Sequence, residues 1–523
     1  MTHKEETFKR IYSGINGIPV VDAHTHIQDD LMNLSAAITA EAVSGTQAAY
    51  NRPPEQVLNV ARKSGRLVRR TMMDATHVLF YSWFAEIAEG SGNRLDKAIS
   101  ILGQNSEEER RAAGKYILGE LQDSRHSEYA EWIRIMYGLY DGAGSIADPL
   151  DAGRFDEVYD AVAAQRHDPA FSENILATNR IAHYVTSIEN RDQIPLKPPV
   201  HPSDVDLSFS THNEAWNMFD FNGFLWPERA TDFGLFTQGH KFEGEKYILH
   251  LEEYLEASIT SVTTLKDAVH SFFMKILRSP RSNPTSRILY VDGFQAEDFR
   301  FSSPWSASIV DYALRHHRDN LDGEKRKQVV SCVAEAILEA LEDIGKEYRE
   351  DGARFGACIQ LCGGATHFMD WTREVQSIPS PIPRLAQDEY PVWIRFPNVH
   401  FEYLCAHEGL YRDMASAAKQ VGNVSVGPWW HSFRRHTVAR LLQDQLSMGP
   451  ISSIACGFTD ARFLEMLVAK YRSLRLAVAE ALTSLVEDEY SSLHGDVDGA
   501  VRIAEELLRT NPSNVHHIPE GDI

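Results

Sequence analysis

The chain has 523 residues, of which 43% are hydrophobic and 24% charged, a composition typical of soluble globular proteins. Its 52 Lys and Arg against 74 Asp and Glu give a net charge of −22, which argues against a nucleic-acid partner, since that affinity comes from neutralising phosphates. No run reaches the roughly 18 apolar residues of a membrane span. The N-terminus lacks a signal-like apolar stretch and the five cysteines lack a CxxC pair, so we expect a cytoplasmic protein without disulfides or membrane contact.

Short apolar runs of about strand length alternate with stretches of helical periodicity along the chain. The predicted strands are Ile18–Ala23, Ile181–Ile188, Gly223–Trp226, Ile288–Val291, Phe355–Leu361, Val399–Cys405, Val424–Val426 and Ile451–Phe458. The clearest amphipathic helix covers Lys325–Arg349, where apolar residues recur every three or four positions. Eight strands that alternate with helices predict an α/β protein built as a (β/α)8 TIM barrel.

The chain is longer than the roughly 250 residues of a bare barrel, so we expect insertions. We predict that residues 1–28 and 179–510 form the barrel and that residues 29–178, after the first strand, form a large, mostly helical insertion. Residues 511–523 contain Pro, Asn, Gly and His and are predicted to be a flexible tail, in which His516 and His517 would be exposed.

The first predicted strand leads into a histidine pair, His24-Thr25-His26, preceded by Asp22. Alternate residues of a strand point to the same face, so both imidazoles would face the mouth of a barrel, where active sites lie. Two imidazoles at this spacing can bind one divalent metal. The alternative is a chance pair of structural histidines.

The last predicted strand leads into Thr459-Asp460-Ala461-Arg462. In a closed barrel Asp460 would lie beside the first strand, where it could bind the same metal and transfer a proton. The alternative is that Asp460 caps the helix that follows. Because Asp460 occurs together with the histidine pair, we favour the functional role.

The two ends together resemble the amidohydrolase superfamily, whose barrels place an HxH pair after the first strand and an Asp after the eighth. The C-terminal part resembles the uronate isomerases, the glucuronate/galacturonate isomerase family. The elements that carry this resemblance are Trp429-Trp430, Gln445-Leu446-Ser447-Met448-Gly449 and Thr459-Asp460-Ala461-Arg462-Phe463.

This resemblance implies a divalent metal, usually zinc, held by His24, His26 and Asp460. It implies that Arg462 binds the carboxylate or a hydroxyl of a sugar acid, and a guanidinium suits a carboxylate because the two form a bidentate pair.

The resemblance also places Trp429 and Trp430 in the wall of the substrate pocket, with core packing as the alternative. Arg229 would correspond to the family's Trp-Arg-Pro-Asp element, although the residue order differs here. We therefore include Arg229 among the predicted substrate-binding residues.

The chain departs from the family pattern in three places. The family's His-Tyr-Lys-Trp segment has no equivalent. Cys362 stands where the family has a fifth-strand His, so either its thiolate replaces the imidazole as a ligand, or it is inert and His367 compensates. His407, after the sixth predicted strand, matches other amidohydrolases, and we predict a catalytic role for it.

The leading hypothesis is a metal-dependent aldose–ketose isomerase that acts on a sugar acid such as glucuronate or galacturonate. The first alternative is a metal-dependent hydrolase or non-oxidative lyase of the same superfamily acting on a small carboxylate. The second is a barrel that has lost its metal and serves as a binding protein. We also expect a homo-oligomer.

Overall fold

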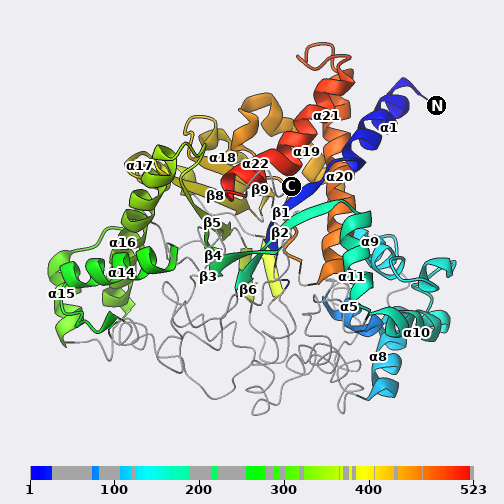
Figure 1. Ribbon diagram of the computed structural model, residues 1–523, viewed down its shortest axis with the longest axis horizontal. Helices are drawn as coiled ribbons and strands as arrows, with labels where there is room; N and C mark the ends of the chain where they lie inside the picture. The colour runs from blue at the N-terminus through cyan, green and yellow to red at the C-terminus, as the bar shows by residue number, and fades with distance from the viewer. Residues whose placement is uncertain are drawn as a thin grey trace.

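The computed structural model describes residues 2–25, 27, 74–81, 106–120, 125–166, 168–188, 215–220, 252, 255–277, 288–294, 301–316, 323–363, 365–368, 376–379, 384–405, 407–428, 434–461 and 463–518. Within these residues no helix combines the length and apolarity needed to cross a bilayer. Figure 1 shows the described elements, with the strands at the centre and helices on either side.

Seven of the described strands form one parallel sheet whose order follows the chain. They are β1 (Val20–Thr25), β2 (Ile181–Ile188), β3 (Ala215–Asp220), β4 (Ile288–Phe294), β5 (Ala357–Gly363), β8 (Val399–Cys405) and β9 (Val424–Pro428). A separate antiparallel pair consists of β6 (Ala365–Phe368) and β7 (Gln376–Pro379). Parallel neighbours in chain order are the product of successive βα units, as the sequence predicted.

One predicted strand lies outside the described residues, and another differs from the structure. The third, Gly223–Trp226, lies outside the described residues, and β3 instead occupies Ala215–Asp220, where polar side chains interrupt the apolar pattern. The eighth, Ile451–Phe458, begins as the 3₁₀ helix η7 (Ile451–Ser453). Beyond η7 the segment 454–461 is joined to both edges of the sheet by isolated parallel bridges, Val426 with Ile454 and Thr25 with Ala461. It therefore links β9 to β1.

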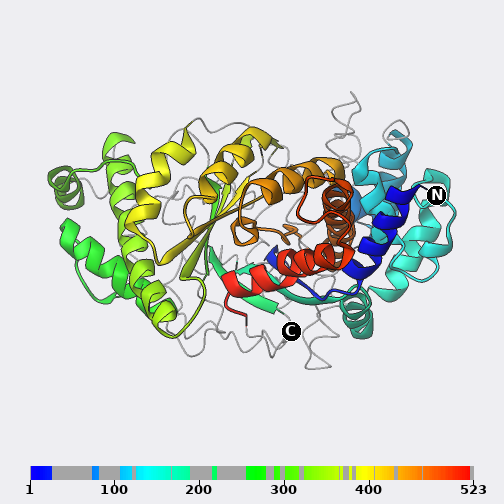
Figure 2. The ribbon, with the colours of Figure 1, turned by 90° about the horizontal axis from the view of Figure 1, so that it is seen from above.

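Helices flank the sheet (Figures 1 and 2). They are α14 (Val262–Leu277), α15 (Ala307–His316), α16 (Gly323–Glu350), α17 (Leu385–Arg395), α18 (Glu408–Ala418), α19 (Arg435–Met448) and α20 (Leu464–Glu487). The amphipathic pattern at Lys325–Arg349 is confirmed as α16, which packs on β5 and β8.

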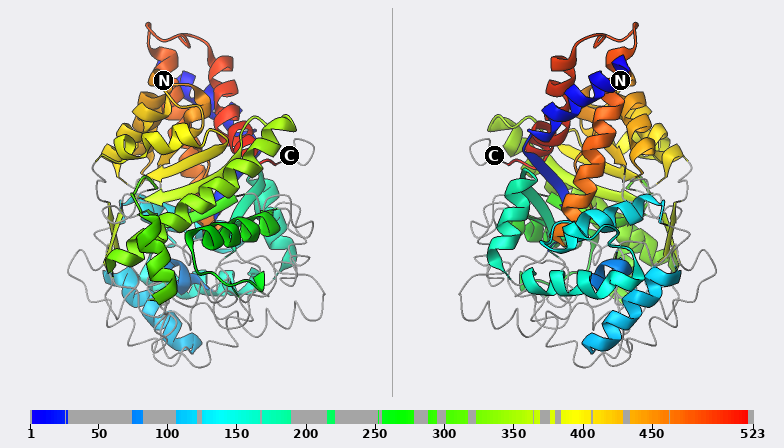
Figure 3. Two further views of the ribbon diagram at one scale, coloured as in Figure 1. Left: turned by 90° about the vertical axis from the view of Figure 1, so that its left-hand side faces the viewer. Right: turned by 90° about the vertical axis from the view of Figure 1, so that its right-hand side faces the viewer.

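Most of the described residues between β1 and β2 are helical. They form α5 (Ala75–Tyr81), α8 (Glu107–Glu120), α9 (Glu128–Tyr137), η3 (Ala143–Ser145), η4 (Ala152–Arg154), α10 (Phe155–Gln165) and α11 (Pro169–Thr178). The right-hand view of Figure 3 shows these helices beside α20. Their apolar side chains share one hydrophobic core with α20 and with α1 (His3–Asn16). Trp132 Nε1 also donates to Ser473 Oγ at 2.9 Å, so α9 is fixed directly to α20.

Strand β8 shows how the two faces of the sheet differ. Its outward residues Val399, Phe401, Tyr403 and Cys405 pack into the core beneath the helices. The alternate residues His400 and Glu402 are equally buried but belong to the inner face. Gln360 on β5 and Ser425 on β9 continue this polar inner face.

The C-terminal segment differs from the predicted tail. It forms α21 (Val497–Glu505), the π-helical turn η8 (Glu506–Thr510) and α22 (Asn511–Val515), and α22 contacts β1 (Figure 1). His516 is 0% exposed, so the prediction that it faces solvent is wrong. His517 Nε2 is 2.9 Å from the carbonyl oxygen of Gly356, immediately before β5. Residues 519–523 lie outside the described residues.

Candidate active site

His24 and Asp460 meet at the carboxyl end of β1. His24 Nε2 lies 3.3 Å from Asp460 Oδ1, and the two side chains are 0% and 9% exposed. The Asp460 amide donates to the His24 carbonyl at 2.9 Å, which fixes the two backbones together. The capping alternative for Asp460 is wrong, because α20 begins after Phe463 and has no side-chain cap. The predicted proximity of the two residues is thus observed.

Asp460 has a backbone conformation that non-glycine residues rarely adopt. Its φ is 52°, in the left-handed region, a type of strain that is concentrated at functional sites. Asp22 holds the preceding residue in place, because its carboxyl group is 2.5 Å from Thr459 Oγ1 and 3.2 Å from the Thr459 amide. The same carboxyl accepts from the His24 amide at 2.9 Å. Burial raises the pKa of Asp22 to about 8, although these hydrogen bonds lower it.

Gln360 and Glu402 lie behind His24 on the inner face. Gln360 Oε1 is 2.6 Å from His24 Nδ1, and Gln360 Nε2 is 2.7 Å from Glu402 Oε2. His516 Nε2 lies 3.3 Å from the same Glu402 oxygen. Burial alone would raise the pKa of Glu402, but the His516 imidazole and the Gln360 amide outweigh it and hold the pKa below its ordinary value. None of these three residues was predicted to belong to the site, although an acid within the apolar run Val399–Cys405 is a signal of a buried polar contact.

The geometry of His24 and Asp460 suits a shared metal ion. Donors at about 2.05 Å from a tetrahedral zinc stand roughly 3.3 Å apart, and the observed N–O separation is 3.3 Å. This separation is longer than the usual N–H···O hydrogen bond of about 2.9 Å. Among the described residues no three His, Cys, Asp or Glu side chains converge on a metal position. The described part of the chain therefore supplies two adjacent donors.

Several predicted site residues lie outside the described part of the chain, namely His26, Arg229, Trp429, Trp430 and Arg462. Cys362 belongs to the end of β5, but its side chain is not among those described. His367 belongs to β6, which pairs with β7 and not with the main sheet. These roles therefore remain predictions.

His407 begins α18 as its N-cap. Its Nδ1 accepts from the Gly409 and Leu410 amides at 3.1 and 3.4 Å. This contact gives His407 a structural role, since a capped helix start is typically stabilised by about 1 kcal/mol. His407 has no described contact with His24 or Asp460, so its catalytic role stays a prediction.

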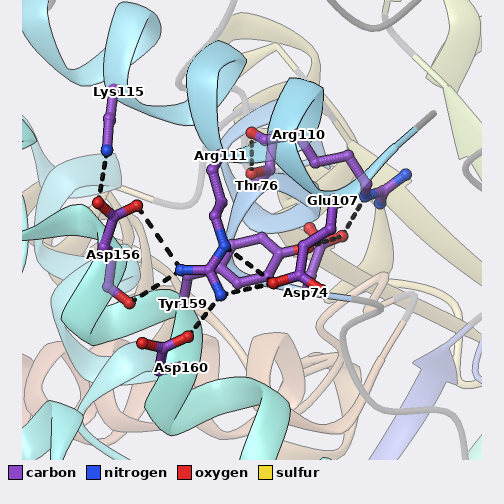
Figure 4. Close-up of polar contacts among 9 residues, drawn as sticks. All are labelled: Asp74, Thr76, Glu107, Arg110, Arg111, Lys115, Asp156, Tyr159 and Asp160. Atoms are coloured by element: carbon purple, nitrogen blue, oxygen red, sulfur yellow. Dashed lines mark hydrogen bonds and ion pairs between the residues drawn. The ribbon is translucent and has the colours of Figure 1, made fainter. Parts of the chain in front are cut away.

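A cluster of charged side chains, separate from the His24–Asp460 pair, joins the helices between β1 and β2 (Figure 4). It joins α8 to α10 and to the residue before α5 through the pairs Arg110–Asp74, Arg111–Asp160 and Lys115–Asp156. Arg111 also lies 4.2 Å from the centre of the Tyr159 ring. The anchored α5 in turn contacts the site region, because the His77 and Phe463 rings lie 5.3 Å apart.

No protein-family model matches the chain, and no curated protein matches it in sequence. Its fold is similar to that of a uronate isomerase from Thermotoga maritima, with 12% identity and a TM-score of 0.66 over 98% of this chain and 97% of that one. A glucuronate isomerase from Caulobacter crescentus shows 11% identity and a TM-score of 0.69 over 99% and 95%. A uronate isomerase from Bacillus halodurans C-125 shows 14% identity and a TM-score of 0.61 over 99% of this chain and 97% of that one. A proposed metal-dependent hydrolase from Lactobacillus casei ATCC 334 shows 10% identity and a TM-score of 0.51 over 98% of each chain. The chain thus has the fold of uronate isomerases, as its sequence predicted.

Proposed function

We propose that the protein is a metal-dependent aldose–ketose isomerase that acts on a sugar acid such as glucuronate or galacturonate. The observation that carries the proposal is the meeting of His24 and Asp460 at the carboxyl end of β1, within a fold shared with uronate isomerases. We infer a (β/α)8 barrel of the amidohydrolase type, in which residues 454–461 take the eighth position because they bridge β9 and β1.

In this proposal His24, His26 and Asp460 hold a divalent metal, which we expect to be zinc. Imidazole and carboxylate are suitable zinc ligands, and the 3.3 Å separation fits two of them. When bound, the metal supplies a Lewis acid near the oxygens of the open-chain sugar. We expect the chain to be a homo-oligomer with a small-molecule substrate.

Asp460 would transfer the proton that defines the reaction. Its carboxylate would remove the proton from C2 of the open-chain aldehyde and return it to C1, while the hydroxyl proton moves from O2 to O1. The aldose then becomes the ketose without any external oxidant or reductant. Arg462 would bind the substrate carboxylate as a bidentate pair, and Arg229, Trp429 and Trp430 would complete the pocket.

The test is proton NMR of the metal-loaded protein in D₂O with D-glucuronate and, separately, D-galacturonate. We expect ketose signals to grow, with the position of any deuterium reporting how the proton moves. Asp460→Asn should lower the rate at least ~100-fold, the usual contribution of a general acid–base group. The matched control is Asp168→Asn, because the Asp168 side chain caps α11. Full activity of Asp460→Asn would contradict the mechanism, and absence of ketose from both acids would contradict the substrate.

The second candidate is a metal-dependent hydrolase or non-oxidative lyase acting on a small carboxylate. The observation that favours it is the similarity in fold to a proposed metal-dependent hydrolase. Here Asp460 would act as base toward water, with His407 as a further catalytic group. The same spectra distinguish the reactions, because bond cleavage yields two products and isomerisation yields one.

A further inference from the structure

A continuous line of buried polar side chains runs from His24 to the C-terminal segment. Gln360 Oε1 lies 2.6 Å from His24 Nδ1, and Gln360 Nε2 lies 2.7 Å from Glu402. Glu402 Oε2 lies 3.3 Å from His516 Nε2, and all four residues are at most 2% exposed. Barrel interiors are ordinarily filled by branched apolar side chains, and buried polar groups are costly without partners. The line therefore requires an explanation.

The surroundings of the Gln360 amide determine its orientation. Its nitrogen lies 3.2 Å from the Ala23 carbonyl oxygen and 2.7 Å from Glu402 Oε2, and both of these atoms are acceptors. The amide oxygen therefore faces His24. Because an amide oxygen only accepts, His24 Nδ1 must carry the proton. His24 Nε2 then keeps its lone pair on the side of Asp460, as a metal ligand requires.

Glu402 and His516 hold the amide in this orientation. The register of β5 and β8 places Glu402 directly opposite Gln360, and its carboxylate gives the amide nitrogen a charged acceptor. His516, immediately after α22, reaches Glu402 from the C-terminal segment.

We propose that Gln360, Glu402 and His516 are positioning residues that hold His24 in the Nδ1–H tautomer and so prepare its Nε2 for a metal. The C-terminal segment thereby contributes to the site without contacting substrate. The inference deepens the proposed function and rests on it for the identity of His24 as a metal ligand.

The test is the ¹⁵N NMR spectrum of ¹⁵N-histidine-labelled, metal-free protein, which reports the tautomer of each ring. His24 is assigned among the 22 histidines by its absence in His24→Gln. We expect a protonated Nδ1 in the unaltered protein. Gln360→Met removes the acceptor at similar length and should populate the Nε2–H tautomer. It should also raise the Kd for Zn²⁺, measured by chelator competition, ~10–100-fold.

Three further variants separate positioning from packing. The double variant Gln360→Glu/Glu402→Gln exchanges the two side chains, so it retains one carboxylate and one amide. Its Zn²⁺ affinity should be close to that of the unaltered protein and higher than that of Gln360→Met. Ser425→Ala breaks a buried hydrogen bond to His400, 2.9 Å in length, without touching the line, and should leave both readouts unchanged. His516→Gln should raise the Kd less than Gln360→Met does.

An Nε2–H tautomer in the unaltered protein would overturn the inference, even if no variant folds. A Gln360→Met protein that keeps the original tautomer and Zn²⁺ affinity would also overturn it. An unchanged Kd for Zn²⁺ in His516→Gln would show that His516 is not a positioning residue. These outcomes are independent of turnover. The expected tautomer in a protein that isomerises neither uronate contradicts only the proposed function, whereas an active isomerase with the other tautomer contradicts only the inference.

Discussion

Replacing His400 with Gln should reduce the sensitivity of the protein to acid. His400 is 1% exposed, and its Nε2 lies 2.9 Å from Ser425 Oγ. Burial lowers the pKa of His400 from 6.5 to about 4. The Glu402 carboxylate opposes this lowering, whereas His516 and His517 add to it. Gln is neutral at every pH and can still hydrogen bond to Ser425, so the substitution removes mainly the titration.

The pKa values determine the sign and size of the effect. The unfolded chain binds a proton at His400 near pH 6.5, whereas the folded chain binds it only near pH 4. Between these values the unfolded state holds more protons, so the free energy of unfolding falls as the pH falls. The contribution is fully present above pH 6.5 and is lost as the pH falls to about 4. The difference of 6.5 − 4, at 1.36 kcal/mol per unit, amounts to about 3 kcal/mol.

Urea unfolding at pH 7, 6 and 5 measures this contribution. From pH 7 to pH 5 the unaltered protein should lose about 2 kcal/mol more of its free energy of unfolding than His400→Gln loses. His494→Gln is the control, because His494 lies exposed on the surface and that variant should follow the unaltered protein. The comparison uses the slope against pH, so a constant loss of stability in His400→Gln does not affect it. Parallel slopes for the unaltered protein and His400→Gln would refute the reasoning.

Two substitutions test how the sheet is joined. Gly427→Ala would place a Cβ 2.1 Å from a backbone carbonyl oxygen of the segment that links β9 to β1. The variant should therefore lose ~1–3 kcal/mol of its free energy of unfolding, measured by thermal unfolding, whereas Gly422→Ala, with open space around it, should not. Equal melting temperatures of the two variants would contradict the close approach. Tyr471→Phe removes the 2.9 Å hydrogen bond to the buried Val21 carbonyl and should cost about 1–3 kcal/mol. Tyr490→Phe, at a 96% exposed position, should change nothing, and a Tyr471→Phe protein as stable as the original would show that the carbonyl finds another partner.

The fold could be predicted where apolar runs coincide with strands buried beneath helices. The pattern of Lys325–Arg349 located α16, and the run Val399–Cys405 has the same bounds as β8, because these elements bury an apolar face that is visible in the sequence. Strand β3 was missed because its run AWNMFD mixes polar and apolar residues. The helical turn η7 was missed because an apolar run of strand length does not reveal its backbone conformation.

Of the candidate site, only the pair His24 and Asp460 could be predicted from the sequence. His24 and Asp460 follow predicted strands, so the topology of a barrel was enough to bring them together. Gln360 and Glu402 come together only through the register of β5 and β8, which no local pattern specifies. His516 was assigned to an exposed tail because composition indicates loose ends, whereas the tertiary contacts of α22 bury it.

The polar inner face is what the proposed role of His24 as a metal ligand would require. An imidazole that presents Nε2 to a metal needs an acceptor at Nδ1, and inside the sheet that acceptor must itself be oriented. Gln360 provides it at 2.6 Å, and its amide nitrogen then needs the acceptors Glu402 and Ala23. A buried carboxylate in turn needs partners, which Gln360 and His516 supply. Each polar group on the line thus requires the next one. For this reason the strands cannot be filled with branched apolar residues on the inner face, and the last helix of the chain must return to the centre of the fold.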